Sequence, residues 1–214
     1  VPGGSAVHKV ACGVTASRNF LEQAAAWSAD AVLVHHGLFW RKGVRMIDPL
    51  LSERLKPLYQ HEMALLAYHL PLDAHPEVGN NARIAAELNA AVVKMEGISA
   101  IAEVAEPMAF GDFSLRCATI FGQEPVFTSA DASAPVKRLG ICSGGGADFA
   151  YELMDHGIDT FLTGEVSERH WHDLNELGLN FAVCGHYATE TFGIKALMPV
   201  LAAEFPDIEL SFFS

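Results

Sequence analysis

Three short segments of the chain carry histidine beside a carboxylate or a second histidine, the residue types that bind divalent metals in proteins. The first is the pair His35-His36, the second runs from His69 to Asp73, and the third runs from His186 to Glu190. Taken singly, each has an ordinary explanation: one core and one surface histidine, a capping aspartate, and a chance pair. Taken together, the five side chains His35, His36, Asp73, His186 and Glu190 predict a metal site.

The spacing within the segments decides whether they can converge. Adjacent residues in a strand point to opposite faces, so both histidines reach one site only if the strand ends there and Gly37 lets the backbone turn. The interval from His186 to Glu190 places both side chains on one face if the segment is helical. Pro71 breaks regular structure, so we expect a loop before Asp73.

Each segment directly follows an apolar run that is typical of a buried strand, at 31–34, 64–68 and 181–184. Because ligands bind at the carboxyl ends of strands in open α/β sheets, we expect the three segments to meet there. The remaining runs predict further strands at 7–14, 138–142, 160–163 and 210–214, and helices at 18–28, 49–61, 80–88, 113–121, 149–156, 167–177 and 189–204.

The order of these elements recurs along the chain. Residues 30–36 align with 159–165, and the interval from His69 to Asp73 equals that from His186 to Glu190. The alternative is that α/β proteins resemble themselves by default. We predict an α/β fold of two similar intertwined halves, 1–90 and 136–214, joined by a connecting segment at 91–135 in one compact unit.

Composition restricts the partners. The net charge of −12 provides neither a basic footprint for nucleic acid nor a polybasic membrane patch, and no apolar run reaches the length of a membrane span. A bound metal would supply the cation that an anionic substrate needs. The four cysteines form no CxxC pair and predict buried reduced thiols, which favours a cytoplasmic location: Cys12, Cys117, Cys142 and Cys184.

Several strings of residues resemble the Nif3-like dinuclear metal-centre family, which includes the bacterial YbgI proteins and is often labelled GTP cyclohydrolase 1 type 2 homolog. The resemblance runs from about Val7 to the C-terminus. It rests on five motifs in the family's order: HHGLFW at 35–40, YHLPLDAH at 68–75, GNN at 79–81, TGEVSE at 163–168 and GHYATE at 185–190. The family's N-terminal helix is missing before Val1, so we expect a longer natural protein.

The resemblance implies mixed sheets flanked by helices and a homohexameric ring, a trimer of dimers, with two divalent ions per subunit. It implies that His36 and Asp73 hold one ion, that His35 and His186 hold the other, and that Glu190 bridges them. The family's second histidine before the alanine is replaced by a tyrosine at 187, which alters only the surroundings of the ligands.

The first functional hypothesis is a metal-dependent hydrolase, in which metal-activated hydroxide attacks a small nucleotide-like or phosphorylated substrate. Glu165 would move protons, or orient a ligand histidine, or merely stabilise a helix N-terminus; His75 would shuttle protons or hydrogen-bond a loop. The alternative is a non-enzymatic metal-binding scaffold or interaction protein. The ligand set suits Zn, Fe, Mn and Ni alike, so the metal stays open.

Overall fold

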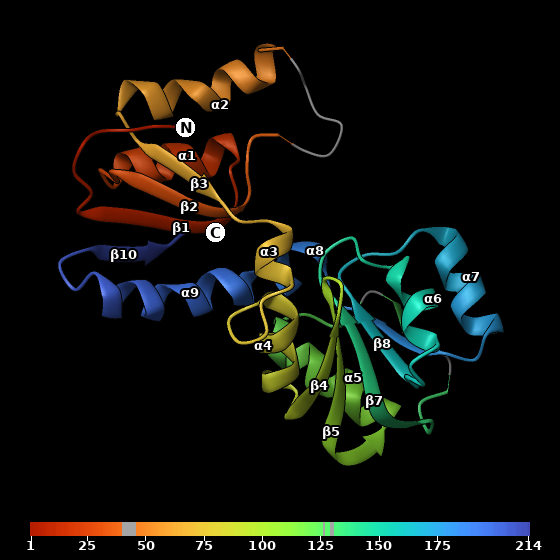
Figure 1. The fold of residues 1–214 in the computed structure, drawn as a ribbon. Coiled ribbons are helices and arrows are strands. Elements are labelled where there is room, and N and C mark those ends of the chain that lie inside the picture. The colour runs from red at the N-terminus through yellow and green to blue at the C-terminus, as the bar shows by residue number, and fades with distance from the viewer. Residues whose placement is uncertain (40–45, 126, 129–130) are drawn as a thin grey trace. The chain divides into compact units, whose positions relative to one another are not determined.

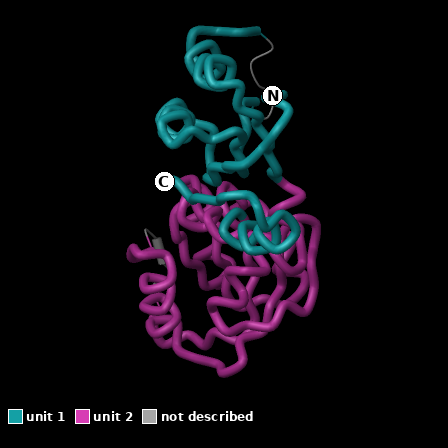
Figure 2. The backbone as a smooth tube through the Cα atoms, turned by 90° about the vertical axis from the view of Figure 1, so that its left-hand side faces the viewer, with its two compact units in different colours: residues 1–69, 194–214 teal, residues 70–193 magenta. Residues whose placement is uncertain are grey.

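The computed structural model describes residues 1–39, 46–125, 127–128 and 131–214, which form two compact units (Figures 1 and 2). The first unit comprises Val1–His69 and Ile194–Ser214, and the second comprises Leu70–Gly193. The chain therefore passes between the units at 69/70 and again at 193/194. The boundaries expected from the sequence, after residues 90 and 135, both fall inside the second unit, because the connecting segment is part of that unit's sheet.

The first unit is built on a four-stranded sheet of order β10-β1-β2-β3, in which every neighbouring pair is parallel. The side chain of Ser17 accepts from the backbone N–H of Phe20 and caps the helix that follows β1. Apolar residues of both helices and of β2 form one core cluster. The elements are β1 (Lys9–Thr15), α1 (Arg18–Ala26), β2 (Ala31–His36), α2 (Pro49–Gln60), β3 (Ala64–Ala67), most of α9 (Thr191–Glu204) and β10 (Glu209–Phe212).

The second unit is built on a six-stranded mixed sheet of order β4-β5-β7-β8-β9-β6. Strands β7, β8 and β9 are parallel, whereas the β4–β5, β5–β7 and β6–β9 pairs are antiparallel. Two core clusters stabilise it. The elements are α3 (Leu70–Asp73), α4 (Asn80–Glu87), β4 (Ala90–Glu96), β5 (Ser99–Ala109), α5 (Phe110–Phe121), β6 (Phe127–Thr128), β7 (Pro135–Cys142), α6 (Phe149–Met154), β8 (Thr160–Thr163), α7 (Glu168–Glu176), β9 (Asn180–Val183) and α8 (His186–Thr189).

The internal repeat extends to individual hydrogen bonds. Each unit contains a parallel β-α-β-α-β segment, β1 to β3 in the first and β7 to β9 in the second. Asp30 precedes β2, and its carboxylate accepts from the backbone N–H groups of His8 and Lys9. Asp159 precedes β8, and its carboxylate accepts from the N–H groups of Lys137 and Arg138. In each repeated segment, an aspartate before the middle strand is therefore hydrogen-bonded to the backbone at the preceding strand.

Three parts of the chain differ from the sequence prediction. The segment before Asp73 is the short helix α3 rather than a loop, because Pro71 occupies the first turn, where no backbone N–H is needed. The helix expected at 189–204 is α9 (Thr191–Glu204), and a separate short helix, α8, lies before it on the other side of Glu190. The hairpin of β4 and β5 was not predicted at all.

All four cysteine side chains are buried, as the sequence predicts. Burial raises the pKa of Cys12 to about 11 and that of Cys142 to about 12, so both thiols stay protonated at neutral pH. Among the residues that the structure describes, no helix is both long and apolar enough to cross a membrane.

Candidate metal centre

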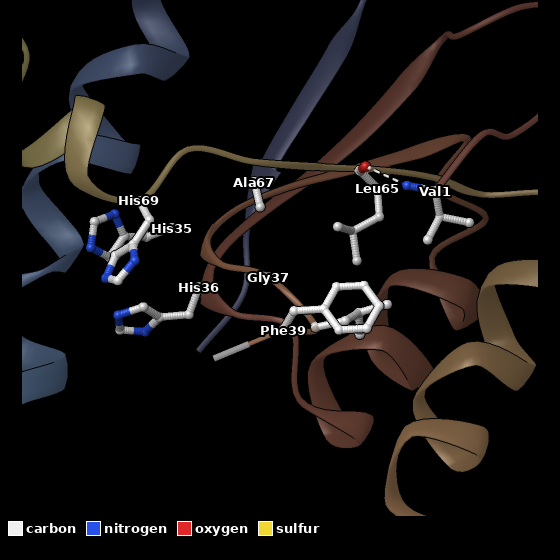
Figure 3. Close-up of a pocket in the computed structure, with 9 residues that line it drawn as sticks. Val1, His35, His36, Gly37, Phe39, Leu65, Ala67 and His69 are labelled. Carbon is white, nitrogen blue, oxygen red and sulfur yellow. Dashed lines mark hydrogen bonds between the residues drawn. The ribbon is translucent and has the colours of Figure 1, made fainter. Parts of the chain in front are cut away.

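Three histidine side chains of the first unit lie together at the carboxyl end of its sheet (Figure 3). His35 and His36 are the last two residues of β2 and are buried, and His69 comes shortly after β3. The ring centroids of His35 and His36 are 4.6 Å apart, and that of His69 lies 4.9 and 5.0 Å from them. One ring nitrogen from each lies within 4.8 Å of the other two. The adjacent histidines thus share one site, and His69 joins them.

Two of these imidazoles are fixed through their Nδ1 atoms. His35 Nδ1 lies 3.0 Å from the carbonyl oxygen of Tyr68. Because a carbonyl only accepts, this Nδ1 carries the proton and the lone pair lies on Nε2. His36 Nδ1 lies 3.1 Å from the hydroxyl oxygen of Thr15, which is the register partner of His36 in the pairing of β1 with β2. Both contacts fix the ring through Nδ1, which is the arrangement usual for histidines that ligate metals.

A cavity of about 340 Å³ adjoins the three histidines (Figure 3). Its other walls are mainly apolar and include Leu38, Phe39, Leu65 and Ala67. The ring of Phe39 is 68% exposed, so it is not part of the core of the first unit. The neighbouring Trp40, which the sequence motif includes, lies outside the described residues.

The second unit brings His186 and Glu190 together, as their spacing predicts. His186 begins α8, Glu190 follows it, and His186 Nε2 lies 3.1 Å from Glu190 Oε2. On the opposite side of the ring, His186 Nδ1 lies 3.2 Å from Glu165 Oε1. Hydrogen bonding to Glu190, aided by Glu165, raises the pKa of His186 to about 9 despite partial burial. When no metal is bound, the ring is therefore a cation between two carboxylates.

The Ser143–Gly146 turn packs directly against Glu190 and His186, which explains the glycine at 144. Gly144 has a φ of +61°, and a Cβ built on it would lie 2.0 Å from Glu190 Oε1. A Cβ on Gly164 would lie 2.7 Å from the Cα of His186. The turn therefore forms a wall of the site.

Asp73 ends α3 and is held by a buried polar network. Its Oδ1 accepts from Asn80 Nδ2 at 2.9 Å and from Ser143 Oγ at 3.1 Å. Asn80 Oδ1 in turn accepts from the backbone N–H of Gly193 at 2.7 Å, three residues after Glu190. Asp73 is thus hydrogen-bonded to the turn that begins at Ser143, and the N–H of Gly144 in the same turn donates to Thr189 Oγ1, next to Glu190, at 3.0 Å.

Sequence reasoning missed this supporting network as a functional feature. Asn80 and Asn81 are both completely buried, and Asn81 Oδ1 accepts from the N–H of Ser143 at 2.8 Å. Buried asparagine is uncommon without such bonds. The signal was the pair of asparagines after Gly79, where a helix start was expected.

The two residues suggested for proton transfer have different surroundings. Glu165 contacts a predicted ligand, His186. His75 Nδ1 accepts from the backbone N–H groups of Glu77 and Val78, each at 3.2 Å, which closes the turn that precedes α4. The contacts of His75 therefore match the loop alternative, whereas those of Glu165 match an orienting role.

The chain belongs to the Duf34/NIF3 (NGG1p interacting factor 3) family, whose model matches residues 2–214. Within that family it is similar to a GTP cyclohydrolase 1 type 2 homolog from Pseudomonas aeruginosa, at 39% identity over 96% of this chain and 83% of that protein.

Two solved structures share the fold closely. That of protein ybgI, described as of unknown function, has a TM-score of 0.93 and 39% identity over 100% of this chain and 86% of the other. That of TTHA1606 from Thermus thermophilus has a TM-score of 0.89 and 32% identity, again over 100% and 86%. These findings confirm the family and the α/β fold expected from the sequence.

Proposed function

We propose that the protein is a metal-dependent hydrolase with two divalent cations, ligated by His35 and His36 of the first unit and Asp73, His186 and Glu190 of the second. The substrate class is a small phosphorylated or nucleotide-like molecule. The observation that carries the proposal is that each proposed histidine ligand is held through Nδ1. Tyr68 holds His35, Thr15 holds His36, and Glu165 holds His186.

The donor set fits divalent metals. Three imidazoles and two carboxylates exceed the roughly four ligands of one tetrahedral ion and suit two ions with a shared carboxylate. The buried carboxylate of Glu190 and the imidazole of His186, 3.1 Å apart, are separated as two ligands of one cation would be. Burying acidic groups in this way is costly unless a cation or hydrogen bonds compensate them.

Two divalent cations would supply Lewis acidity for the hydrolysis of a carbonyl or phosphoryl group. The residues of the chain would do the rest. Asn80 and Ser143 fix the carboxylate of Asp73, the glycine turn holds Glu190, and the mainly apolar wall beside His35 and His36 would accommodate the uncharged part of a substrate.

The test is a hydrolysis screen on protein loaded with Mn²⁺, Fe²⁺, Zn²⁺ or Ni²⁺, with phosphoesters, nucleotides and cyclic amides as substrates. We expect turnover that Glu190→Gln lowers at least about 100-fold together with metal content. Glu176→Gln, at an exposed position of α7, is the matched control and should leave both unchanged.

Two outcomes would contradict the enzyme proposal. Metal binding without turnover on any substrate class would favour the non-enzymatic scaffold. Turnover that survives Glu190→Gln while the metal is lost would show that the activity does not depend on the centre.

A further inference from the structure

We infer that Glu165 is a positioning residue: its carboxylate fixes the His186 ring through Nδ1 so that Nε2 is presented to the metal. The inference rests on the proposed function, because it assigns His186 as a ligand. It separates Glu165 from the role of proton carrier that the sequence also allowed.

The backbone places Glu165 firmly. The N–H groups of Gly164 and Glu165 both donate to the carbonyl of Gly144 at 3.0 Å, and the N–H of Gly185 donates to the carbonyl of Gly164 at 3.0 Å. Because Gly164 has no side chain, the end of β8 approaches the backbone of His186 closely. From this position the Glu165 carboxylate reaches His186 Nδ1 at 3.2 Å.

The three proposed histidine ligands differ in what holds Nδ1. His35 faces a main-chain carbonyl and His36 faces a hydroxyl, whereas His186 faces a carboxylate. A carboxylate partner orients the ring and also makes the opposite nitrogen a stronger donor to a cation. We therefore expect the metal held by His186 to depend on Glu165 and the other metal to be insensitive to it.

The exposure of the Glu165 side chain indicates that its contact with His186 is not needed for folding. The Glu165 side chain is 62% exposed, whereas the side chain of Glu190 on the other side of the ring is 5% exposed. Surface substitutions of this kind change stability little, and exposed ion pairs contribute little to it. A loss of metal affinity on replacing Glu165 would therefore report the contact with His186 and not general unfolding.

The experiment titrates Zn²⁺ into metal-free protein against a competing chelator and resolves the two equivalents. Glu165→Ala should weaken one equivalent about 10- to 100-fold and leave the other unchanged. Glu165→Gln keeps an acceptor oxygen for Nδ1–H and should recover a large part of the loss. Glu176→Ala, at an exposed glutamate of the same unit, should match the wild type.

A second readout follows the ring itself. In the Zn²⁺-loaded wild type and in Glu165→Gln, the Nδ1–H proton of His186 should give a protected NMR resonance, identified by its loss in His186→Gln. In Glu165→Ala this proton should exchange rapidly with water.

The outcomes separate the two proposals. If Glu165→Ala keeps both affinities and the protected proton, the inference is wrong while the metal centre stands. If the wild type itself binds no Zn²⁺, the proposed function fails and this inference fails with it.

Discussion

Replacing Gly144 with alanine should remove metal binding through a single added methyl group. The new Cβ would lie 2.0 Å from Glu190 Oε1, about 1.4 Å inside the 3.4 Å at which ordinary contact begins. Because the atom that is struck ends a side chain, the carboxylate can move, but it must leave its position 3.1 Å from His186 Nε2. A displacement of this size at a ligand should lower metal affinity at least about 100-fold.

The matched control is Gly157→Ala. Gly157 has a φ of +71° and Gly144 a φ of +61°, so both replacements carry the backbone strain of a left-handed alanine. That strain is about 1–2 kcal/mol, which corresponds to a fall in Tm of roughly 2–8 °C for a chain of this size. A Cβ on Gly157 meets nothing within 4 Å, so this variant should lose stability and keep its metal.

The assay combines thermal unfolding of the metal-free variants with metal titration by calorimetry. The expected pattern is a similar fall in Tm for both variants and a loss of affinity only in Gly144→Ala. If both variants bind metal like the wild type, the glycine turn does not form a wall of the metal site and the reasoning from Glu190 is refuted.

Three further predictions concern the network, the repeat and assembly. Asn80→Ala removes one hydrogen-bond donor to Asp73 and the acceptor for the buried N–H of Gly193, so unfolding should become easier by about 1–3 kcal/mol in denaturant titrations; an unchanged midpoint would contradict the network. The hydrogen bond from the backbone N–H of His8 is the main cause that holds the pKa of Asp30 below its usual range. The ionised Asp30 carboxylate therefore stabilises the fold above the unfolded-state pKa of about 3.9, and this stabilisation is lost as the pH falls through the lower folded-state pKa. Asp30→Asn should therefore lower Tm near pH 7 more than near pH 2, and an equal effect at both would refute the linkage. Finally, light scattering should give a particle of about six times 23.1 kDa, the mass of one chain, and a monomer would exclude the proposed hexamer.

The strands that precede the candidate site could be predicted because their continuous apolar runs indicate that they are buried. The run from Ala31 to Val34 is apolar on both faces, and all of β2 is buried. The matching positions of Asp30 and Asp159 in the sequence indicate the repeat, and both carboxylates accept from the backbone of the preceding strand.

The β4–β5 hairpin could not be predicted, since its strands contain many residues that favour helices. Alanine, glutamate and methionine recur through 90–109, and pairing with β7 overrides their preference for helix. The remaining signal was Gly97, which has a φ of +57° in the turn between the strands.

The groups that contact Nδ1 of His35 and His36 could not be predicted from the sequence either. Tyr68 holds His35 through its main-chain carbonyl, which carries no mark in the sequence. Thr15 reaches His36 only because strand register places the two residues opposite each other. The candidate ligands and their spacing are therefore visible in the sequence, but the contacts that orient these side chains are not.

The most direct test of the account is diffraction from crystals of the metal-loaded protein, recorded on both sides of the absorption edge of the metal. The account predicts two anomalous peaks, each about 2.0–2.6 Å from ligand atoms of the set His35, His36, Asp73, His186 and Glu190. Peaks at other residues, or no peak at this set in protein saturated with metal, would contradict it.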